Sequence, residues 1–176
     1  MEISKYSPVI EETFLDYPSP EGNAVLVYLT GCEHHCPNCH SPILQKIQDY
    51  IDTPEELTEK ITDYCKRADT NKIVLLGGDP LHPANLELTR YILNKIGKTH
   101  DICVFTGYDI DYVKENKLTG AKYWKCGLFI QEQARKSGKT DTEYTLASPN
   151  QNFYDENYNQ ISQNGILNFN NLEKGK

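Results

Sequence analysis

The sequence lacks any long apolar run and any excess of basic residues. No stretch approaches the roughly 20 apolar residues of a membrane-spanning helix, so we expect no membrane partner. There are 25 acidic and 18 basic residues, giving a net charge of −7. This charge repels phosphate backbones and argues against a nucleic-acid partner. The first residues, MEISKYSPVIEE, lack a basic stretch followed by an apolar one, so we expect no signal peptide and a cytoplasmic location.

The chain is also short for a complete eight-unit β/α barrel. It has 176 residues, whereas such barrels need about 200 or more. No internal repeat is visible. We expect a single domain over residues 1–176, with a core of about 23–154 and a polar C-terminal extension over 155–176.

Strand-like and helix-like segments alternate along the first three quarters of the chain. Apolar, β-branched runs predict buried strands, and capping signals with helical spacing predict helices. This alternation is typical of a parallel sheet with helical crossovers, so we predict an α/β fold built as a partial, open parallel β/α barrel. The predicted strands are 24–30, 72–78, 102–107 and 121–130, and the predicted helices are 54–68, 83–96 and 111–116.

The last quarter of the chain is polar. The segment 133–145 is typical of a surface loop, and Asn164-Gly165 is typical of a two-residue hairpin turn. We therefore predict a small C-terminal hairpin or edge strand, with a frayed end over 173–176.

The six cysteines are unevenly distributed. Cys65 falls on the apolar face of a predicted helix and Cys103 lies inside a predicted strand, so both are expected to be small core residues. The position of Cys126, on the fourth predicted strand, leaves its role open. The other three occupy one short segment directly after the first predicted strand: Cys32, Cys36 and Cys39 in TGCEHHCPNCHSP.

Three interpretations of this cysteine segment are open. Structural zinc normally takes four ligands, so a zinc site would need one histidine from His34, His35 or His40. Three unligated thiols in an exposed loop would be prone to oxidation. An iron–sulfur cubane usually takes four thiolates, so three would leave one iron open to a small molecule.

A second chemical segment follows the second predicted strand. Gly77 and Gly78 would let a ligand approach the backbone closely, and the Asp79 carboxylate could accept hydrogen bonds from an ammonium group. In parallel α/β sheets, ligands gather at the carboxyl ends of the strands. The cysteine segment, this turn and the turn at Thr106-Gly107-Tyr108 should therefore meet at one edge.

Cys-x3-Cys-x2-Cys followed by Gly-Gly-Asp resembles the radical S-adenosylmethionine superfamily. Within it, LTGCEHHCPNCHSP, LLGGDPLHPAN, CVFTGYD and ASPNQNFYD resemble the activating component of anaerobic (class III) ribonucleotide reductase. The resemblance implies a [4Fe–4S] cluster and S-adenosylmethionine as cofactors. It also implies an oxidoreductase that makes a 5′-deoxyadenosyl radical and installs a glycyl radical on the large reductase subunit. An electron donor such as a flavodoxin-like protein is a further implied partner.

The resemblance assigns roles to individual residues. Cys32, Cys36 and Cys39 would hold the cluster. The residues that it places around S-adenosylmethionine are Gly77, Gly78, Asp79, Thr106, Gly107, Tyr108, Lys125, Asn150 and Gln151. Lys125 would meet the cofactor carboxylate.

The sequence departs from the family in two places. Cys126-Gly127 stands where many members have Asp-Gly, and FLDYPSPEGN differs from the common N-terminal segment. Other functions remain open: an activase for a pyruvate formate-lyase type of enzyme, a radical enzyme acting on a small molecule, or a zinc-binding interaction module.

Overall fold

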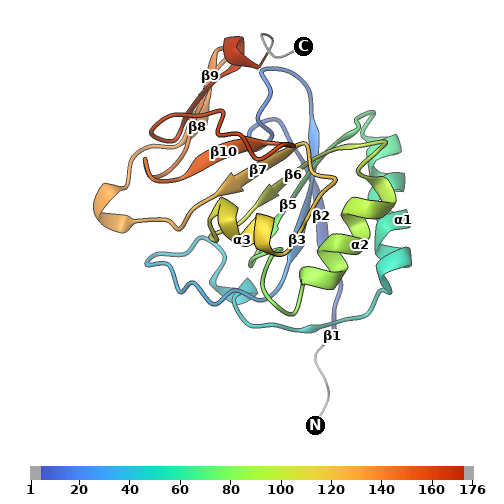
Figure 1. Cartoon of the computed structure of the whole chain (residues 1–176). Coiled ribbons are helices and arrows are strands. Elements are labelled where there is room, and N and C mark those ends of the chain that lie inside the picture. The colour runs from blue at the N-terminus through green and yellow to red at the C-terminus, as the bar shows by residue number, and fades with distance from the viewer. Residues whose placement is uncertain (1–4, 173–176) are drawn as a thin grey trace.

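A six-stranded sheet forms the centre of the computed structural model, which describes residues 5–172 (Figure 1). Four neighbouring strands are parallel, and an antiparallel strand flanks them at each end. In spatial order the strands are β10 (Asn152–Asp155), β7 (Tyr123–Cys126), β6 (Asp101–Phe105), β5 (Lys72–Gly77), β3 (Ala24–Leu29) and β2 (Val9–Thr13). The predicted α/β class and parallel sheet are confirmed. The sheet is open, since within residues 5–172 its end strands β10 and β2 do not pair with each other.

Three helices follow the parallel strands as crossovers, and they cover one face of the sheet (Figure 1). They are α1 (Pro54–Arg67), α2 (Leu86–Ile96) and α3 (Ile110–Glu115). The predicted start of α1 is confirmed in detail, because Thr53 and Glu56 form a reciprocal capping box and Pro54 occupies the first helical position between them. The helix α2 begins at Leu86 rather than at Pro83, because the residues before it form turns.

The two faces of the sheet bury separate apolar clusters. The cluster under the helices includes Leu57, Ile92 and Trp124. The opposite cluster includes Tyr144, Phe153 and residues of the C-terminal quarter. Alternate residues along each strand point to opposite faces, so a fully buried sheet needs a cover on both sides.

The predicted strand 121–130 is too long. The strand β7 ends at Cys126, and Gly127 follows with a φ of +117°, a backbone conformation that side chains rarely allow.

The predicted surface loop 133–145 was also wrong in part. It carries β8 (Gly138–Lys139) and β9 (Glu143–Thr145), which join β11 (Ile166–Asn168) in a three-stranded sheet. The predicted turn at Asn164-Gly165 is confirmed, with φ of 49° and 68°. However, the strand after it pairs with β9, and only one bridge joins the two sides of the turn.

The remaining elements are short. They are β1 (Lys5–Tyr6), β4 (Asp49–Tyr50), and the 3-10 turns η1 (Pro42–Leu44), η2 (Gln131–Gln133) and η3 (Phe169–Asn171). The end predicted to fray, 173–176, lies outside the described residues. Among the helices of residues 5–172, none has the length and apolar character that crossing a bilayer requires.

Candidate functional site

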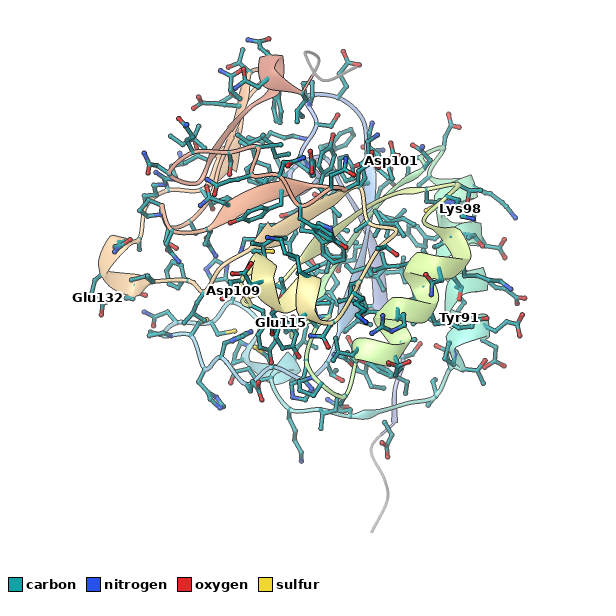
Figure 2. All side chains as sticks on the ribbon, viewed as in Figure 1. Tyr91, Lys98, Asp101, Asp109, Glu115 and Glu132 are labelled. Carbon is teal, nitrogen blue, oxygen red and sulfur yellow. The ribbon has the colours of Figure 1, made fainter. Side chains whose placement is uncertain are left out.

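The predicted site segments all follow parallel strands at the same edge of the sheet. Figure 2 shows the two ends of β6: Asp101 begins this strand, and Asp109 lies just beyond its end, on the opposite edge. The cysteine segment passes along that second edge, as the light-blue ribbon after β3 shows (Figure 1). The predicted meeting of three segments at one edge is confirmed by hydrogen bonds that join them, described below.

The cysteine loop, which we define as residues 31–41, is fixed at its base by backbone hydrogen bonds. The N–H groups of Gly31 and Cys32 donate to the carbonyls of Leu44 and Gln45, at 2.7 and 2.8 Å. The N–H of Asp79 donates to the carbonyl of Gly31 at 2.6 Å. Both the exit of the loop and the neighbouring turn therefore hold its first residues.

The three loop cysteines are half-buried and free of disulfides, whereas Cys65, Cys103 and Cys126 are buried. Burial raises the pKa of the Cys32 thiol, the backbone N–H of His34 lowers it, and the nearby Asp79 and the other loop cysteines raise it again. Cys36 and Cys39 line a cavity of about 310 Å³. Within residues 5–172, no three Cys, His, Asp or Glu side chains are arranged around a single metal-ion position.

The loop fits a cubane cluster by the chemistry of its donors. Such a cluster binds each thiolate through a different iron, so its ligands need not converge on one point. Three half-buried thiols lie on one loop beside a cavity, and the other three cysteines are sealed in the core. The described residues thus offer three thiolates to this site.

The glycine pair fills a packing role. A Cβ on Gly77 would lie 2.5 Å from the carbonyl oxygen of Leu29, and one on Gly78 would lie 2.5 Å from that of Gly31. The absence of side chains therefore lets the turn after β5 lie directly against the start of the cysteine loop. This placement brings the loop and the turn together within backbone hydrogen-bond distance.

Asp79 is 1% exposed and is the centre of a hydrogen-bond network. Its carboxylate accepts from the Thr106 hydroxyl at 2.8 and 3.0 Å and from the backbone N–H groups of Leu81 and Gly107 at 2.8 and 2.9 Å. The His34 ring nitrogen Nε2 lies 2.7 Å from its second oxygen. The three predicted segments therefore converge on this buried carboxylate.

Tyr108 extends this network over the loop. Its ring stacks on that of Tyr112, with the ring centroids 4.0 Å apart. The His34 ring lies edge to face with it, with the centroids 4.6 Å apart. Its hydroxyl donates to the Glu33 carboxylate. Burial and this carboxylate raise the pKa of Tyr108. The tyrosine remains a neutral donor that clamps the cysteine loop.

Lys125 lines the same cavity as Cys36 and Cys39. Its ammonium lies 5.6 Å from the centre of the Phe105 ring. Burial lowers the pKa of Lys125, although Cys126, Asp79 and Cys36 act in the opposite direction. Among residues 5–172, no carboxylate forms an ion pair with it. The cavity therefore holds a cation that an anionic ligand would stabilise.

Asn150 and Gln151 hold the backbone that follows β7. The Asn150 amide donates to the Leu128 carbonyl at 2.7 Å, and the Gln151 amide donates to the Gly127 carbonyl at 3.2 Å. Gln151 also lines the cavity, so it shapes the site from the C-terminal side. Cys126 joins the apolar cluster beneath the helices, and burial raises its pKa to about 12.

Asn85 is a buried residue that fastens the site, and no local signal in the sequence marked it. Asn85 precedes α2, where an asparagine usually caps the helix, but its side chain makes no cap hydrogen bond. Its amide instead donates to the carbonyls of Thr30 and Asp79, at 2.7 and 2.9 Å. Only the three-dimensional proximity of β3 and the turn after β5 gives this asparagine its role. Phe105 and Tyr144, which line the cavity, were likewise assigned no site role from the sequence.

Comparison with known proteins points to the same chemistry. The family model described as a 4Fe-4S single cluster domain matches residues 20–154. Similar curated proteins include the anaerobic ribonucleoside-triphosphate reductase-activating proteins of Haemophilus influenzae and Vibrio cholerae, both 28% identical to this chain. The first match covers 69% of this chain and 84% of that protein, and the second covers 76% and 88%. The protein of the same name from Salmonella typhimurium is 30% identical, over 63% of this chain and 71% of that protein. No solved structure matches.

The matched region contains the cysteine loop, the glycine turn and Gln151, and it covers well over half of the chain. The predicted iron–sulfur cluster is supported by this match, at the level of a single [4Fe–4S] domain. The chain therefore belongs to the 4Fe-4S single cluster domain family, as a homologue of the anaerobic ribonucleoside-triphosphate reductase-activating proteins.

Proposed function

We propose that this protein is a radical S-adenosylmethionine activase that installs a glycyl radical on an anaerobic ribonucleotide reductase. The observation that carries the proposal is the set of three half-buried thiols on one loop, two of which line a cavity that also holds the Lys125 ammonium, unpaired within residues 5–172. The relatives' names and the 4Fe-4S domain support the same function. When bound, a reduced [4Fe–4S] cluster supplies the electron that splits S-adenosylmethionine and so provides a radical able to take hydrogen from a glycine.

Each part of the site has a task in this proposal. Cys32, Cys36 and Cys39 hold the cluster and leave one iron for the cofactor. Lys125 meets the carboxylate of S-adenosylmethionine, because an ammonium buried without a counter-ion gains most from an anionic ligand. Gln151 faces the cofactor from the C-terminal side of the cavity, and Asn150 fixes the backbone beside it. The other residues assigned to the cofactor do not line this cavity but act on it through the cysteine loop that they hold: Gly77, Gly78, Asp79, Thr106, Gly107 and Tyr108.

The open sheet supports the proposed partner. In this proposal the fold of the chain corresponds to the partial barrel of radical S-adenosylmethionine proteins, in which an unclosed side can admit a segment of another chain. We propose that the glycine-bearing segment of the large reductase subunit enters from that side, in the cytoplasm, and that a flavodoxin-like protein supplies the electron.

The test is anaerobic reconstitution with iron and sulfide, followed by S-adenosylmethionine, a reductant and the matching reductase subunit. We expect an electron paramagnetic resonance (EPR) doublet from a glycyl radical on that subunit. Pyruvate formate-lyase in place of the reductase should give no doublet. A doublet on pyruvate formate-lyase alone would show that the substrate is that enzyme and not the reductase. Stoichiometric zinc without iron would show that the protein is a zinc-binding module and not a radical enzyme.

A further inference from the structure

The tip of the cysteine loop depends on few contacts. Backbone hydrogen bonds from the rest of the protein hold the two ends of the loop, at Gly31, Cys32 and Ser41. The backbone bond described between these ends, from Cys39 to Cys36, stays within the loop. Side chains must therefore hold the segment between the first and second cysteines. Two of them do so: Glu33 accepts from Tyr108, and His34 reaches Asp79.

His34 occupies a space prepared for it. A Cβ added to Gly107 would lie 2.5 Å from the His34 Cδ2 atom and 2.6 Å from Nε2. Gly107 is not among the glycines with positive φ, so its backbone does not require a glycine. The space that the imidazole occupies explains why this position has no side chain.

The partner of His34, Asp79, is also held by other donors. Asp79 is buried and accepts hydrogen bonds from Thr106, Gly107 and Leu81, which hold the carboxylate in one orientation. A carboxylate only accepts, so the Nε2 atom of His34 carries the donating hydrogen. The His34 side chain is 14% exposed, which shields this hydrogen bond from water.

His34 is also linked to the first cysteine. His34 lies two residues after Cys32 and two residues before Cys36. Fixing its imidazole on Asp79 therefore restrains the short backbone segment between these two proposed cluster ligands. Outer groups that orient metal ligands in this way commonly change metal affinity by about 10- to 100-fold.

We propose that His34 is the positioning residue of the cysteine loop. Seated against Gly107 and bonded to Asp79, it fixes the loop between Cys32 and Cys36 so that the three thiolates stand ready for the cluster. This inference rests on the proposed function only in assuming that the loop holds a [4Fe–4S] cluster. Under this proposal His34 is not a zinc ligand, although its position in the sequence also allowed that role.

The test compares three variants of the anaerobically reconstituted protein: His34→Asn, His34→Gln and His35→Asn. Asparagine is too short to reach Asp79, whereas the glutamine amide can place a donor near the position of Nε2. His35 is exposed and has a φ of 49°, which asparagine tolerates, so its variant controls for changes in the same loop. The readouts are the rate at which a chelator removes iron and the EPR spectrum of the reduced cluster.

We expect His34→Asn to lose iron about tenfold faster than the unchanged protein and to show a broadened spectrum. His35→Asn should match the unchanged protein, and His34→Gln should recover most of the lost retention. Equal iron loss from His34→Asn and His35→Asn would overturn the positioning role, as would no rescue by glutamine. A parent protein that binds no [4Fe–4S] cluster would instead refute the proposed function itself.

A second pair of variants covers the case in which His34→Asn fails to fold. Gly107→Ala should accelerate iron loss in the parent protein, because the new methyl group displaces the imidazole. In a His34→Ala background the same change should have little further effect, since the two residues act through one contact. Additive effects of the two changes would contradict the proposal.

Discussion

The cysteine loop and the sheet core each hold three cysteines, in opposite environments. Those of the loop are half-buried and lie close together in the sequence, and two of them, Cys36 and Cys39, border a cavity with an ammonium group. Those of the core are buried singly among apolar side chains, and burial raises the pKa of Cys65 to about 11 and of Cys126 to about 12. Surroundings, rather than residue type, separate thiols that can bind a cluster from thiols that only pack.

Replacing one cysteine of each set should give the largest difference between the two regions. We expect Cys36→Ala to abolish binding of the [4Fe–4S] cluster, because two thiolates cannot hold it. Cys65→Ala should bind a full cluster and lose only about 1 kcal/mol of unfolding free energy. Iron and sulfide analysis after anaerobic reconstitution measures the first effect, and denaturant unfolding measures the second. A normal cluster in Cys36→Ala would remove this residue from the ligand set.

Alkylation of the metal-free protein should separate the two sets without any substitution. The loop thiols should react with iodoacetamide at least about 100-fold faster than the core thiols, which become accessible only when the structure opens. Mass spectrometry of peptides after timed quenching gives the six rates. Fast labelling of Cys103 or Cys126 would show that the reagent reaches these core thiols without opening of the structure.

Asp79 joins the loop to the sheet, so its removal should affect both regions. Asp79→Ala leaves Thr106, Gly107 and His34 without their acceptor. We expect a loss of about 3 kcal/mol of unfolding free energy, together with weaker binding of S-adenosylmethionine to the holoprotein.

Asp109→Ala is the matched control for Asp79→Ala. It removes an exposed carboxylate that caps α3 through the Tyr112 N–H, and it should cost about 1 kcal/mol. Equal losses in the two variants would show that the buried network adds nothing to stability.

Lys125 gives the smallest expected effect. Lys125→Met should weaken binding of S-adenosylmethionine to the holoprotein about tenfold, equivalent to about 1.4 kcal/mol. The fold should keep its stability, because methionine removes a buried ammonium that no carboxylate among the described residues pairs with. The control is Lys122→Met, which removes an exposed partner of Asp101. Calorimetric titration of both variants with S-adenosylmethionine distinguishes the loss of a local contact from a general loss of positive charge. Unchanged affinity in Lys125→Met would exclude this lysine from the carboxylate site.

The sequence predicted the parts of the molecule that local signals encode. Thr53, Pro54 and Glu56 marked the start of α1, and apolar runs marked the four parallel strands. The edge of the site also followed from topology, since parallel strands bring their carboxyl ends together. Cys65 and Cys103 were assigned correctly to the core from their apolar neighbours, whereas the role of Cys126 was left open by the sequence.

Contacts between distant segments were not predictable in the same way. Nothing local in GCEHHC distinguishes His34 from His35, and only the packing of the turn after β6 places one of them on Asp79. The Gly77-Gly78 pair indicated close approach of a ligand, yet in the structure the protein's own loop occupies that space. The strands β8 and β9 are too short and polar for a period of two to be recognised, and their pairing with β11 depends on tertiary contacts.

Under the proposed function, three loop thiolates hold a [4Fe–4S] cluster with one iron left open to S-adenosylmethionine. The most direct measurement is the EPR spectrum of the reduced, reconstituted protein before and after S-adenosylmethionine is added. We predict a [4Fe–4S] signal that changes on addition of the cofactor and that is missing from Cys36→Ala. A cluster signal that S-adenosylmethionine leaves unchanged, or a protein that takes up zinc and no iron, would contradict this account.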